Sequence, residues 1–418
     1  MNSDAMKQLA MNGGDKVRIE PWPPRYLFAE EEKRAAMDLF DASIASGAAF
    51  SYNGAVEEAY CREFAAFLGG GYADAVNSGT SAVYVALRAL DLEPFTEVIV
   101  PPVTDMGGVM PVPLMNCIPI CADTGPGIYN CGPEQIEARI TERTSAIIVA
   151  HIAGLPADMD PILETARAKG IPVVEDCAQA HGATYKGRYV GTMGDVAAFS
   201  TMSGKHHATG AQGGVVFTKR EDLYWQARRA SDRGKPFGLD NASSNVTCAL
   251  NLNLNDLSAA IGRVQLKKLP AILDGCRNAA KAIDARCRAL KAVTPNMGLP
   301  GTEGAFWFLT FRLDRDKVDC DLDTFVKALQ AEGLPFSHHY TQPFTQQEWF
   351  KKRAVFGTSG YPWTCPLYLG DPGQEYPLPN MEQAHACLFS IKVHENVKDQ
   401  EADDVFAALR KAEAAFLK

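Results

Sequence analysis

The stretch that decides the fold is Val173-Val174-Glu175-Asp176-Cys177-Ala178-Gln179, which leads to Phe199-Ser200 and then to Lys205. An apolar run ends in two acidic side chains, and a second apolar run ends in the hydroxyl of Ser200. Lys205 follows Asp176 by 29 residues. Polar side chains at the ends of buried strands indicate a parallel α/β sheet, because such sheets bind ligands at the carboxyl ends of their strands.

Further strand-like and helix-like segments alternate on both sides of this stretch. Short apolar runs that end in Gly, Pro or Asp stand at 98–103, 117–122, 145–151, 171–175 and 196–200. Helical spacing of apolar residues appears at 56–68, 133–140 and 160–169. This alternation predicts an α/β fold with a mostly parallel sheet between helices. A further strand is predicted at 213–218, with an antiparallel direction.

The C-terminal part has a different pattern. Residues 256–290 read as one long helix that is interrupted near Pro270. A strand at 306–313, helices at 322–332 and 403–417, and a proline-rich loop at 360–379 follow. We therefore expect an N-terminal arm at 1–25, a large domain at 26–270 and a smaller α+β domain at 271–418.

Composition excludes several classes of protein. The chain has 418 residues, 22% of them charged, and a net charge of −9, which argues against nucleic acid as a partner. No apolar run approaches the ~18 residues of a membrane span, and the polar N-terminus lacks a secretory signal. The 11 cysteines are scattered without a Cys-x-x-Cys pair. This pattern predicts reduced thiols in a cytoplasmic protein, with Cys117 and Cys121 buried on one strand face.

The order of Asp176, Ser200 and Lys205 is the one that pyridoxal 5′-phosphate (PLP) chemistry requires. A lysine amine forms a Schiff base with the cofactor aldehyde. A carboxylate beside the ring nitrogen keeps that nitrogen protonated, so that the ring can accept electrons. Hydroxyl and backbone N–H groups hold the phosphate. Lys205 and Asp176 are therefore the candidate catalytic residues.

A second candidate site is Asn77-Ser78-Gly79-Thr80-Ser81, which opens a predicted helix at 81–90. Small residues at a helix N-terminus leave N–H groups free for an anion, and the helix dipole favours negative charge there. A Ser-Gly-Thr sequence can equally be a simple helix cap. Beside the Asp176 and Lys205 signals, it predicts a phosphate site.

These motifs together resemble the DegT family of PLP-dependent sugar aminotransferases, a branch of the aspartate aminotransferase fold (type I). The resemblance covers roughly residues 45–415. It rests on six segments: 77–80, 151–159 (His-Ile-Ala-Gly-Leu-Pro-Ala-Asp-Met), 174–183, 191–195, 199–205 with Gly213-Gly214, and 255–266. It implies a seven-stranded-type sheet in the large PLP-binding domain. It also implies transfer of an amino group from L-glutamate or L-glutamine to a keto sugar, usually nucleotide-linked, or to a keto cyclitol.

The resemblance also implies roles for individual residues. Lys205 would be the Schiff-base residue, Asp176 would bind the pyridine nitrogen and Gln179 would lie beside the ring hydroxyl. The phosphate would be bound by Gly79, Thr80 and Ser200. Asn251 would reach the phosphate of the neighbouring subunit, which implies a homodimer.

Two departures from the family pattern bear on the substrate. The family's ring-stacking aromatic is replaced by Asp105 or Met106, and we expect Met106 to cover the ring face. The family's Asn-x-Arg reads Asn251-Leu252-Asn253, so that a cation is missing. This loss predicts a weaker grip on an anionic substrate, unless the Arg serves only the dimer interface and another cation, Arg233 or Lys235, replaces it.

Other interpretations of single residues stay open or are less favoured. His206-His207 lacks a third ligand at zinc spacing, so no metal site is expected. Asp195 is interpreted as a turn-stabilising residue. His338-His339-Tyr340 could bind substrate or line a domain interface.

Alternative functions are a PLP-dependent sugar dehydratase or another non-transferring enzyme of the same fold, a cofactor-free binding relative, and an NAD-dependent enzyme. The presence of Lys205 argues against the cofactor-free relative. The chain also lacks the Gly-x-Gly-x-x-Gly turn of an NAD site.

Overall fold

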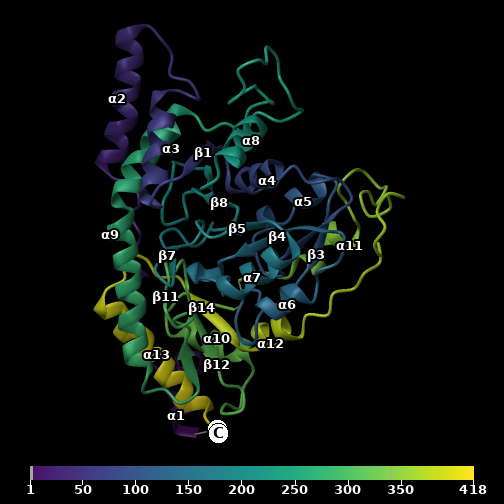
Figure 1. Ribbon diagram of the computed structural model, residues 1–418. Coiled ribbons are helices and arrows are strands. Elements are labelled where there is room, and N and C mark those ends of the chain that lie inside the picture. The colour runs from purple at the N-terminus through teal and green to yellow at the C-terminus, as the bar shows by residue number, and fades with distance from the viewer. Residues whose placement is uncertain (1–2, 339) are drawn as a thin grey trace.

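The computed structural model describes residues 3–338 and 340–418, and their central feature is a seven-stranded sheet (Figure 1). Its strands are, in spatial order, β1 (Tyr72–Val76), β9 (Gly214–Thr218), β8 (Val196–Ser200), β5 (Val173–Asp176), β4 (Thr144–Ala150), β2 (Glu97–Val100) and β3 (Ile118–Cys121). All neighbours are parallel except β9, which runs antiparallel to β1 and β8. The prediction of a mostly parallel sheet with an antiparallel strand at 213–218 is confirmed.

The sheet is covered by helices because nearly every side chain of its strands is buried. These helices are α3 (Ala55–Phe67), α4 (Gly79–Ala89), α5 (Pro111–Leu114), α6 (Pro133–Glu137), α7 (Met159–Lys169) and α8 (Glu221–Ser231). The helix α2 (Glu30–Ser46) instead packs against the long helix α9 (Asp256–Cys287). Short 3₁₀ turns, η2 (Met106–Gly108) and η3 (Ile152–Gly154), follow β2 and β4. Both turns lie at the carboxyl edge of the sheet.

A second, antiparallel sheet forms the core of the C-terminal part. Its order is β10 (Val293–Pro295), β12 (Leu309–Leu313), β14 (Leu388–Ile391) and β13 (Phe336–Ser337). Its helices and 3₁₀ turn are α10 (Leu322–Ala331), η4 (Phe344–Gln346), α11 (Glu348–Lys351), α12 (Pro379–Cys387) and α13 (Asp399–Phe416). A small third sheet, β11 (Thr302–Glu303) with β6 (Thr184–Tyr185) and β7 (Arg188–Tyr189), joins the two parts.

The long helix α9 (Asp256–Cys287) runs through Pro270 without a break. The predicted interruption is therefore wrong. Proline lacks the N–H of a helix interior and its ring presses on the carbonyl four residues earlier, which disfavours a helix. Here α9 packs against α2, α3 and α13 along its length, and this tertiary packing outweighs the local cost (Figure 1). The proposed domain division at residue 270 stays a prediction.

The N-terminal residues pack against the C-terminal part of the chain. α1 (Ser3–Gln8) contacts α13, and η1 (Ala10–Asn12) contacts α10. The Glu332 carboxylate accepts hydrogen bonds from the N–H groups of Ala10 (2.9 Å) and Val17 (3.2 Å). These contacts hold the start of the N-terminal arm against the C-terminal part, and the later residues of the arm extend toward the large sheet. Within the residues described above, no helix combines the length and apolar composition that a bilayer crossing requires.

Candidate active site

Strand register brings the predicted site residues to one edge of the large sheet. Asp176 ends β5 and Ser200 ends β8, its parallel neighbour. Gly214 of β9 aligns with Ser200 on one side and with Val76, the last residue of β1, on the other. Since α4 begins at Gly79, its N-terminus arrives beside Ser200. This is the edge at which parallel α/β sheets bind ligands.

Gly79 and Ser200 form a narrow cradle. An ideal Cβ on Gly79 would lie 2.6 Å from the Ser200 Cβ and 2.8 Å from its Oγ, closer than real contacts allow. Gly214 permits this approach, because a Cβ there would lie 2.4 Å from the carbonyl oxygen of Ser78. The Gly213-Gly214 pair therefore has a steric reason: it lets the start of α4 lie against β8 and β9.

The first N–H groups of α4 point out of the helix. The Ser78 hydroxyl accepts from the Ser81 N–H (3.0 Å), and the Ser78 carbonyl accepts from the Ala82 N–H (3.0 Å). The N–H groups of Gly79 and Thr80 stand before this first helical bond, so the helix itself does not satisfy them. Together with the helix dipole, they provide a site for a phosphate.

Asp176 is buried beside this cradle. One carboxylate oxygen accepts from the Ala178 N–H (3.0 Å), and the other faces the backbone of Gly108, where a Cβ would lie 2.9 Å away. Burial raises the pKa of Asp176, because desolvation disfavours the charged form. A cationic partner, such as a protonated pyridine nitrogen, would restore the carboxylate to its ionised form.

Lys205 is also buried, with 6% of its surface exposed. Burial lowers the pKa of its amine to about 8, whereas the negative charges of Asp176 and Asp105 act in the opposite direction. The Nζ atom lies 3.9 Å from the ring centroid of Trp307. An amine with this pKa is partly neutral near pH 7, which is the form that attacks an aldehyde.

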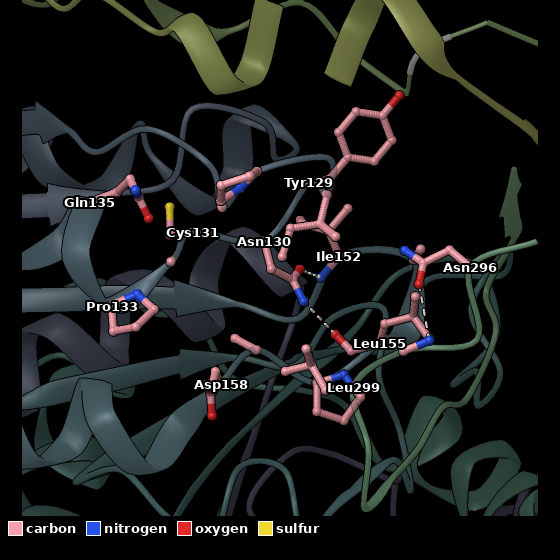
Figure 2. Close-up of a pocket in the computed structure, with 18 of the residues that line it drawn as sticks. Tyr129, Asn130, Cys131, Pro133, Gln135, Ile152, Leu155, Asp158, Asn296 and Leu299 are labelled. Carbon is pink, nitrogen blue, oxygen red and sulfur yellow. Dashed lines mark hydrogen bonds between the residues drawn. The ribbon is translucent and has the colours of Figure 1, made fainter. Parts of the chain in front are cut away.

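Gln179 is fixed by the loop after β4. Its side-chain oxygen accepts from the Ala153 N–H (2.8 Å), and Ala153 adopts a left-handed φ of 63°. The amide of Asn130 holds this loop, since it accepts from the Ile152 N–H (2.8 Å) and donates to the Leu155 carbonyl (2.9 Å) (Figure 2). The loop residues Ile152, Ala153 and Leu155, together with Asn130, line a separate cavity of about 390 Å³ between the loop and the C-terminal part.

The segment after Thr104 carries Asp105 and Met106 in place of the family's aromatic. The Asp105 carboxylate accepts from the Gly107 N–H (2.9 Å), while Met106 is half-buried in η2. A Cβ on Gly107 would lie 2.4 Å from the Thr80 hydroxyl, so this segment lies across the start of α4. That Met106 covers a bound ring stays a prediction.

Asn251 lies in a segment that runs beside the start of α4. Its side-chain oxygen accepts from the Asn253 amide (2.7 Å), and the Asn77 N–H donates to the Leu252 carbonyl (2.8 Å). Contact between Asn251 and a partner's phosphate stays a prediction.

The two cations considered as replacements for the missing arginine share one local carboxylate, which offsets one of their two positive charges. Arg233 (3.0 Å) and Lys235 (2.6 Å) form ion pairs with the same buried carboxylate, Asp232.

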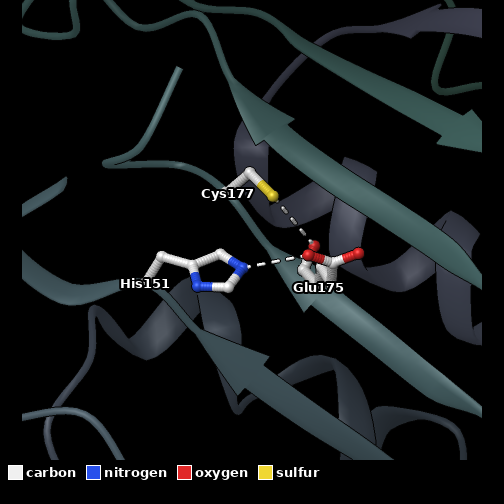
Figure 3. A group of neighbouring side chains, drawn as sticks. All are labelled: His151, Glu175 and Cys177. Carbon is white, nitrogen blue, oxygen red and sulfur yellow. Dashed lines mark hydrogen bonds and ion pairs between the residues drawn. The ribbon is translucent and has the colours of Figure 1, made fainter. Parts of the chain in front are cut away.

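A buried network of neighbouring side chains behind Asp176 consists of His151, Glu175 and Cys177 (Figure 3). The Glu175 carboxylate accepts from His151 Nε2 (3.1 Å) and from the N–H groups of Gly191, Met193 and Gly194 (2.8, 2.8 and 2.6 Å). Burial raises the pKa of Cys177, which keeps it a thiol. The network fixes the loop at 191–194 against β5, and its donors and acceptors are used within the protein.

Two neighbouring positions have structural roles. Asp195 accepts from the Val173 N–H at the start of β5 (2.9 Å) and pairs with Arg220 (3.2 Å), while its interpretation as a turn-stabilising residue stays a prediction. The His206 and His207 rings bind different groups, the Ala305 carbonyl (3.0 Å) and the Tyr60 hydroxyl (2.6 Å). His339 lies outside the described residues.

Sequence reasoning missed several residues of the site. Trp307 comes from the C-terminal part, and its ring packs beside Tyr340 as well as against Lys205. Gly108 contacts Asp176, and Arg25 donates to the backbone of the Lys205 loop. The Gly107-Gly108 pair and the aromatic run at 306–308 were available signals. Arg25 gave none, since it is one of 41 basic residues of the chain and no motif surrounds it.

The arrangement fits PLP. A buried lysine amine, a buried carboxylate and a cradle with N–H groups that the helix leaves unsatisfied match the aldehyde, ring nitrogen and phosphate of this cofactor. The glycine at position 79 allows the start of α4 to approach Ser200, an approach that a Cβ would prevent.

Comparison with known proteins identifies relatives that act on sugars and cyclitols. The chain is 34% identical to GDP-perosamine synthase of Caulobacter vibrioides over 68% of this chain and 77% of the relative. It is 30% identical to the L-glutamine:2-deoxy-scyllo-inosose aminotransferase of Streptoalloteichus tenebrarius over 81% of this chain and 82% of the relative.

A solved structure agrees with these relatives. The S. venezuelae aminotransferase DesV, determined in complex with a ketimine intermediate, is 28% identical. It superposes with a TM-score of 0.79 over 94% of this chain and 99% of DesV. The DegT/DnrJ/EryC1/StrS aminotransferase family model matches residues 30–410. The chain is therefore a PLP-dependent sugar aminotransferase of the DegT/DnrJ/EryC1/StrS family.

Proposed function

We propose that this aminotransferase uses Lys205 to bind the cofactor covalently and passes an amino group from L-glutamate or L-glutamine to a keto sugar or keto cyclitol. The observation that carries the proposal is the convergence of the Lys205 amine, the Asp176 carboxylate and the Gly79–Ser200 cradle at one sheet edge. Bound PLP supplies an electron sink for the substrate's Cα–H bond.

Each site residue has a separate role in proton transfer or in binding the cofactor. The amine of Lys205, with its pKa lowered to about 8, gives and takes a proton near neutral pH. Asp176 holds a proton on the ring nitrogen by its negative charge. Gln179 presents its amide beside the ring, with its oxygen already fixed by Ala153. Gly79, Thr80 and Ser200 bind the phosphate.

The keto substrate is a six-membered ring compound, either a nucleotide-linked sugar or a free cyclitol. The relatives include one enzyme named for a GDP-linked sugar and one named for an inosose with L-glutamine as donor. Asn253 replaces the family's arginine, and the charges of Arg233 and Lys235 are shared with Asp232. This reduced positive charge favours a substrate with fewer phosphates than a nucleotide sugar carries.

We also propose that the enzyme is a homodimer. Met37, Phe40 and Ile44 lie on one face of α2 and are 51%, 45% and 78% exposed. The loop that precedes Asn251 exposes Leu239, Val246 and Leu250 as well. Exposed apolar patches of this kind mark protein interfaces. The cysteines are free thiols, and ten of them are buried or half-buried, which supports action in a reducing compartment such as the cytoplasm.

The test is to reduce the PLP-loaded enzyme with borohydride and to find the modified lysine by mass spectrometry. We expect Lys205 to carry the label, and Lys205→Ala to lose both the label and nearly all transamination. Lys352→Ala is the matched control, because Lys352 is an exposed lysine that pairs with Glu348 away from the site. Full turnover by Lys205→Ala would refute the proposal.

The substrate is tested with the same enzyme. L-glutamate and L-glutamine are compared as donors, and a free keto cyclitol is compared with a nucleotide-linked keto sugar as acceptor. A preference of about a hundredfold for the nucleotide-linked compound, ~2.7 kcal/mol of transition-state binding, would contradict the reduced-charge argument.

A further inference from the structure

Arg25 of the N-terminal arm reaches the loop that carries Lys205. Its guanidinium donates to the carbonyl oxygens of Lys205 and His206, the second at 2.9 Å. The same group donates through Nε to both carboxylate oxygens of Glu395, at 3.0 and 3.1 Å. The Arg25 and Glu395 side chains are only 20% and 18% exposed. The contacts are thus partly shielded from water, where charged hydrogen bonds are stronger.

The arm is itself fixed at this point by three consecutive residues after β14. His394 Nε2 donates to the Pro23 carbonyl (3.0 Å), and Glu395 binds the Arg25 guanidinium. Asn396 donates to the Arg25 carbonyl (2.7 Å). Both the backbone and the side chain of Arg25 are therefore anchored, and the guanidinium is held in one orientation.

The Lys205 loop depends on such side chains because it forms no helix or strand between β8 and β9. The Lys205 N–H donates to the Met202 carbonyl within a turn (2.9 Å). Three consecutive carbonyls face outward from this turn. The Gly204 carbonyl accepts from Trp307 Nε1 (2.9 Å), and the next two accept from Arg25. The backbone of Lys205 is therefore held on both sides by side chains from distant segments.

We propose that Arg25 is a positioning residue for Lys205: it fixes the lysine backbone so that Nζ meets the cofactor aldehyde. The inference rests on the proposed role of Lys205 as the attachment residue. Arg25 acts through geometry, since its hydrogen bonds hold the carbonyl oxygens of Lys205 and His206 while the Glu395 carboxylate offsets its charge. In the attachment step the Lys205 amine and the aldehyde form a C=N bond and release one water molecule.

The experiment measures the rate at which PLP becomes attached to cofactor-free enzyme, trapped by borohydride at timed intervals. Arg25→Met keeps the length of the side chain and removes its hydrogen bonds. We expect the attachment rate at saturating PLP to fall about tenfold or more, the loss of two charged hydrogen bonds. Arg18→Met is the matched control, because Arg18 lies in the same arm and pairs only with Glu401 and Asp404 of α13 among acidic side chains. It should attach PLP at the wild-type rate.

A second readout separates positioning from damage to the cofactor site. Non-covalent PLP affinity is measured by equilibrium dialysis in the Lys205→Ala background, with and without Arg25→Met. We expect the two affinities to agree within about twofold, because Arg25 acts only through Lys205. A wild-type attachment rate in Arg25→Met, an equal loss in Arg18→Met, or a tenfold loss of affinity in the Lys205→Ala background would each overturn the inference. Attachment that persists in Lys205→Ala alone would instead overturn the proposed function.

Discussion

At the scale of the residue, Asp176 is the side chain whose proposed role depends most on its charge. It is buried, which raises its pKa, while the charge of Lys205 acts in the opposite direction, as a protonated ring nitrogen would. We expect Asp176→Asn to bind PLP but to lose well over tenfold in transamination rate, more than ~1.4 kcal/mol of transition-state stabilisation. Single-turnover kinetics with L-glutamate measure this loss.

The control for this change is Asp195→Asn, which alters an acid that caps the Val173 N–H and pairs with Arg220. Its turnover should stay close to that of the wild type. A loss of less than about tenfold in Asp176→Asn would show that the carboxylate does not hold the ring proton.

Three buried histidines behind Lys205 make the enzyme sensitive to acid. His181, His206 and His207 have ring centroids 6.0 to 6.2 Å apart, from His181 to each of the others. Burial lowers their pKa values, to about 3 for His206 and His207. Each is neutral in the folded protein, whereas the unfolded chain takes up a proton below its ordinary pKa of 6.5. These histidines therefore leave the free energy of unfolding unchanged above pH 6.5, and they lower it progressively as the pH drops from 6.5 toward 3.

The measurement compares denaturant unfolding of the wild type with that of His207→Gln. From pH 8 to about pH 5.5 the free energy of unfolding of the variant should fall by about 1.4 kcal/mol less than that of the wild type, the cost of protonating one histidine in the unfolded chain alone. Equal losses in both proteins would mean that His207 is protonated in the folded state.

At the scale of the element, the N-terminus of α4 is the feature to test. A Cβ on Gly79 would lie 2.6 Å from the Ser200 Cβ and 2.8 Å from its hydroxyl oxygen, so the two segments would have to move apart. We expect Gly79→Ala to weaken PLP binding at least about tenfold by displacing the start of α4 from Ser200, with an unchanged circular dichroism spectrum. Gly373→Ala, in an exposed loop with no tight contact, is the control. Wild-type affinity in Gly79→Ala would place the phosphate elsewhere.

The elements also differ in how far local sequence decides them. The strands of the large sheet lie within a few residues of their predicted ends, because each apolar run is buried and bounded by Gly, Pro or Asp. α9 differs, because Pro270 predicts a break and the packing of neighbouring helices prevents it. The helix cap at Ser78 can be predicted from the local sequence. Its closeness to Ser200 cannot, because it depends on β9, whose Gly214 aligns with the ends of both β1 and β8.

At the scale of the whole molecule, the exposed face of α2 predicts assembly. Met37→Glu combined with Ile44→Glu places two charges on this face, and burying a charge without a partner is costly. We expect light scattering to show a dimer for the wild type and a monomer for the double variant, with loss of activity. Leu369→Glu, which changes an 82% exposed side chain outside α2, should remain a dimer. A wild-type monomer with full activity would contradict the prediction.

By itself, the sequence determined the fold class and the family, and it singled out Asp176 and Lys205 as candidate catalytic residues. Buried apolar runs that alternate with helices favour covered parallel strands, and Asp176, Ser200 and Lys205 stand at the ends of such runs or just after them. These sequence patterns are local, so they can be recognised without knowledge of the tertiary structure.

Tertiary structure alone decided what surrounds Lys205. Arg25 precedes it by 180 residues and Trp307 follows it by 102, and no local pattern links such distant positions. The pKa of the lysine amine, the shape of the phosphate cradle and the position of the Lys205 loop all depend on burial and contacts between distant segments. These quantities exist only after the strands have paired and the N-terminal arm has packed against the C-terminal part.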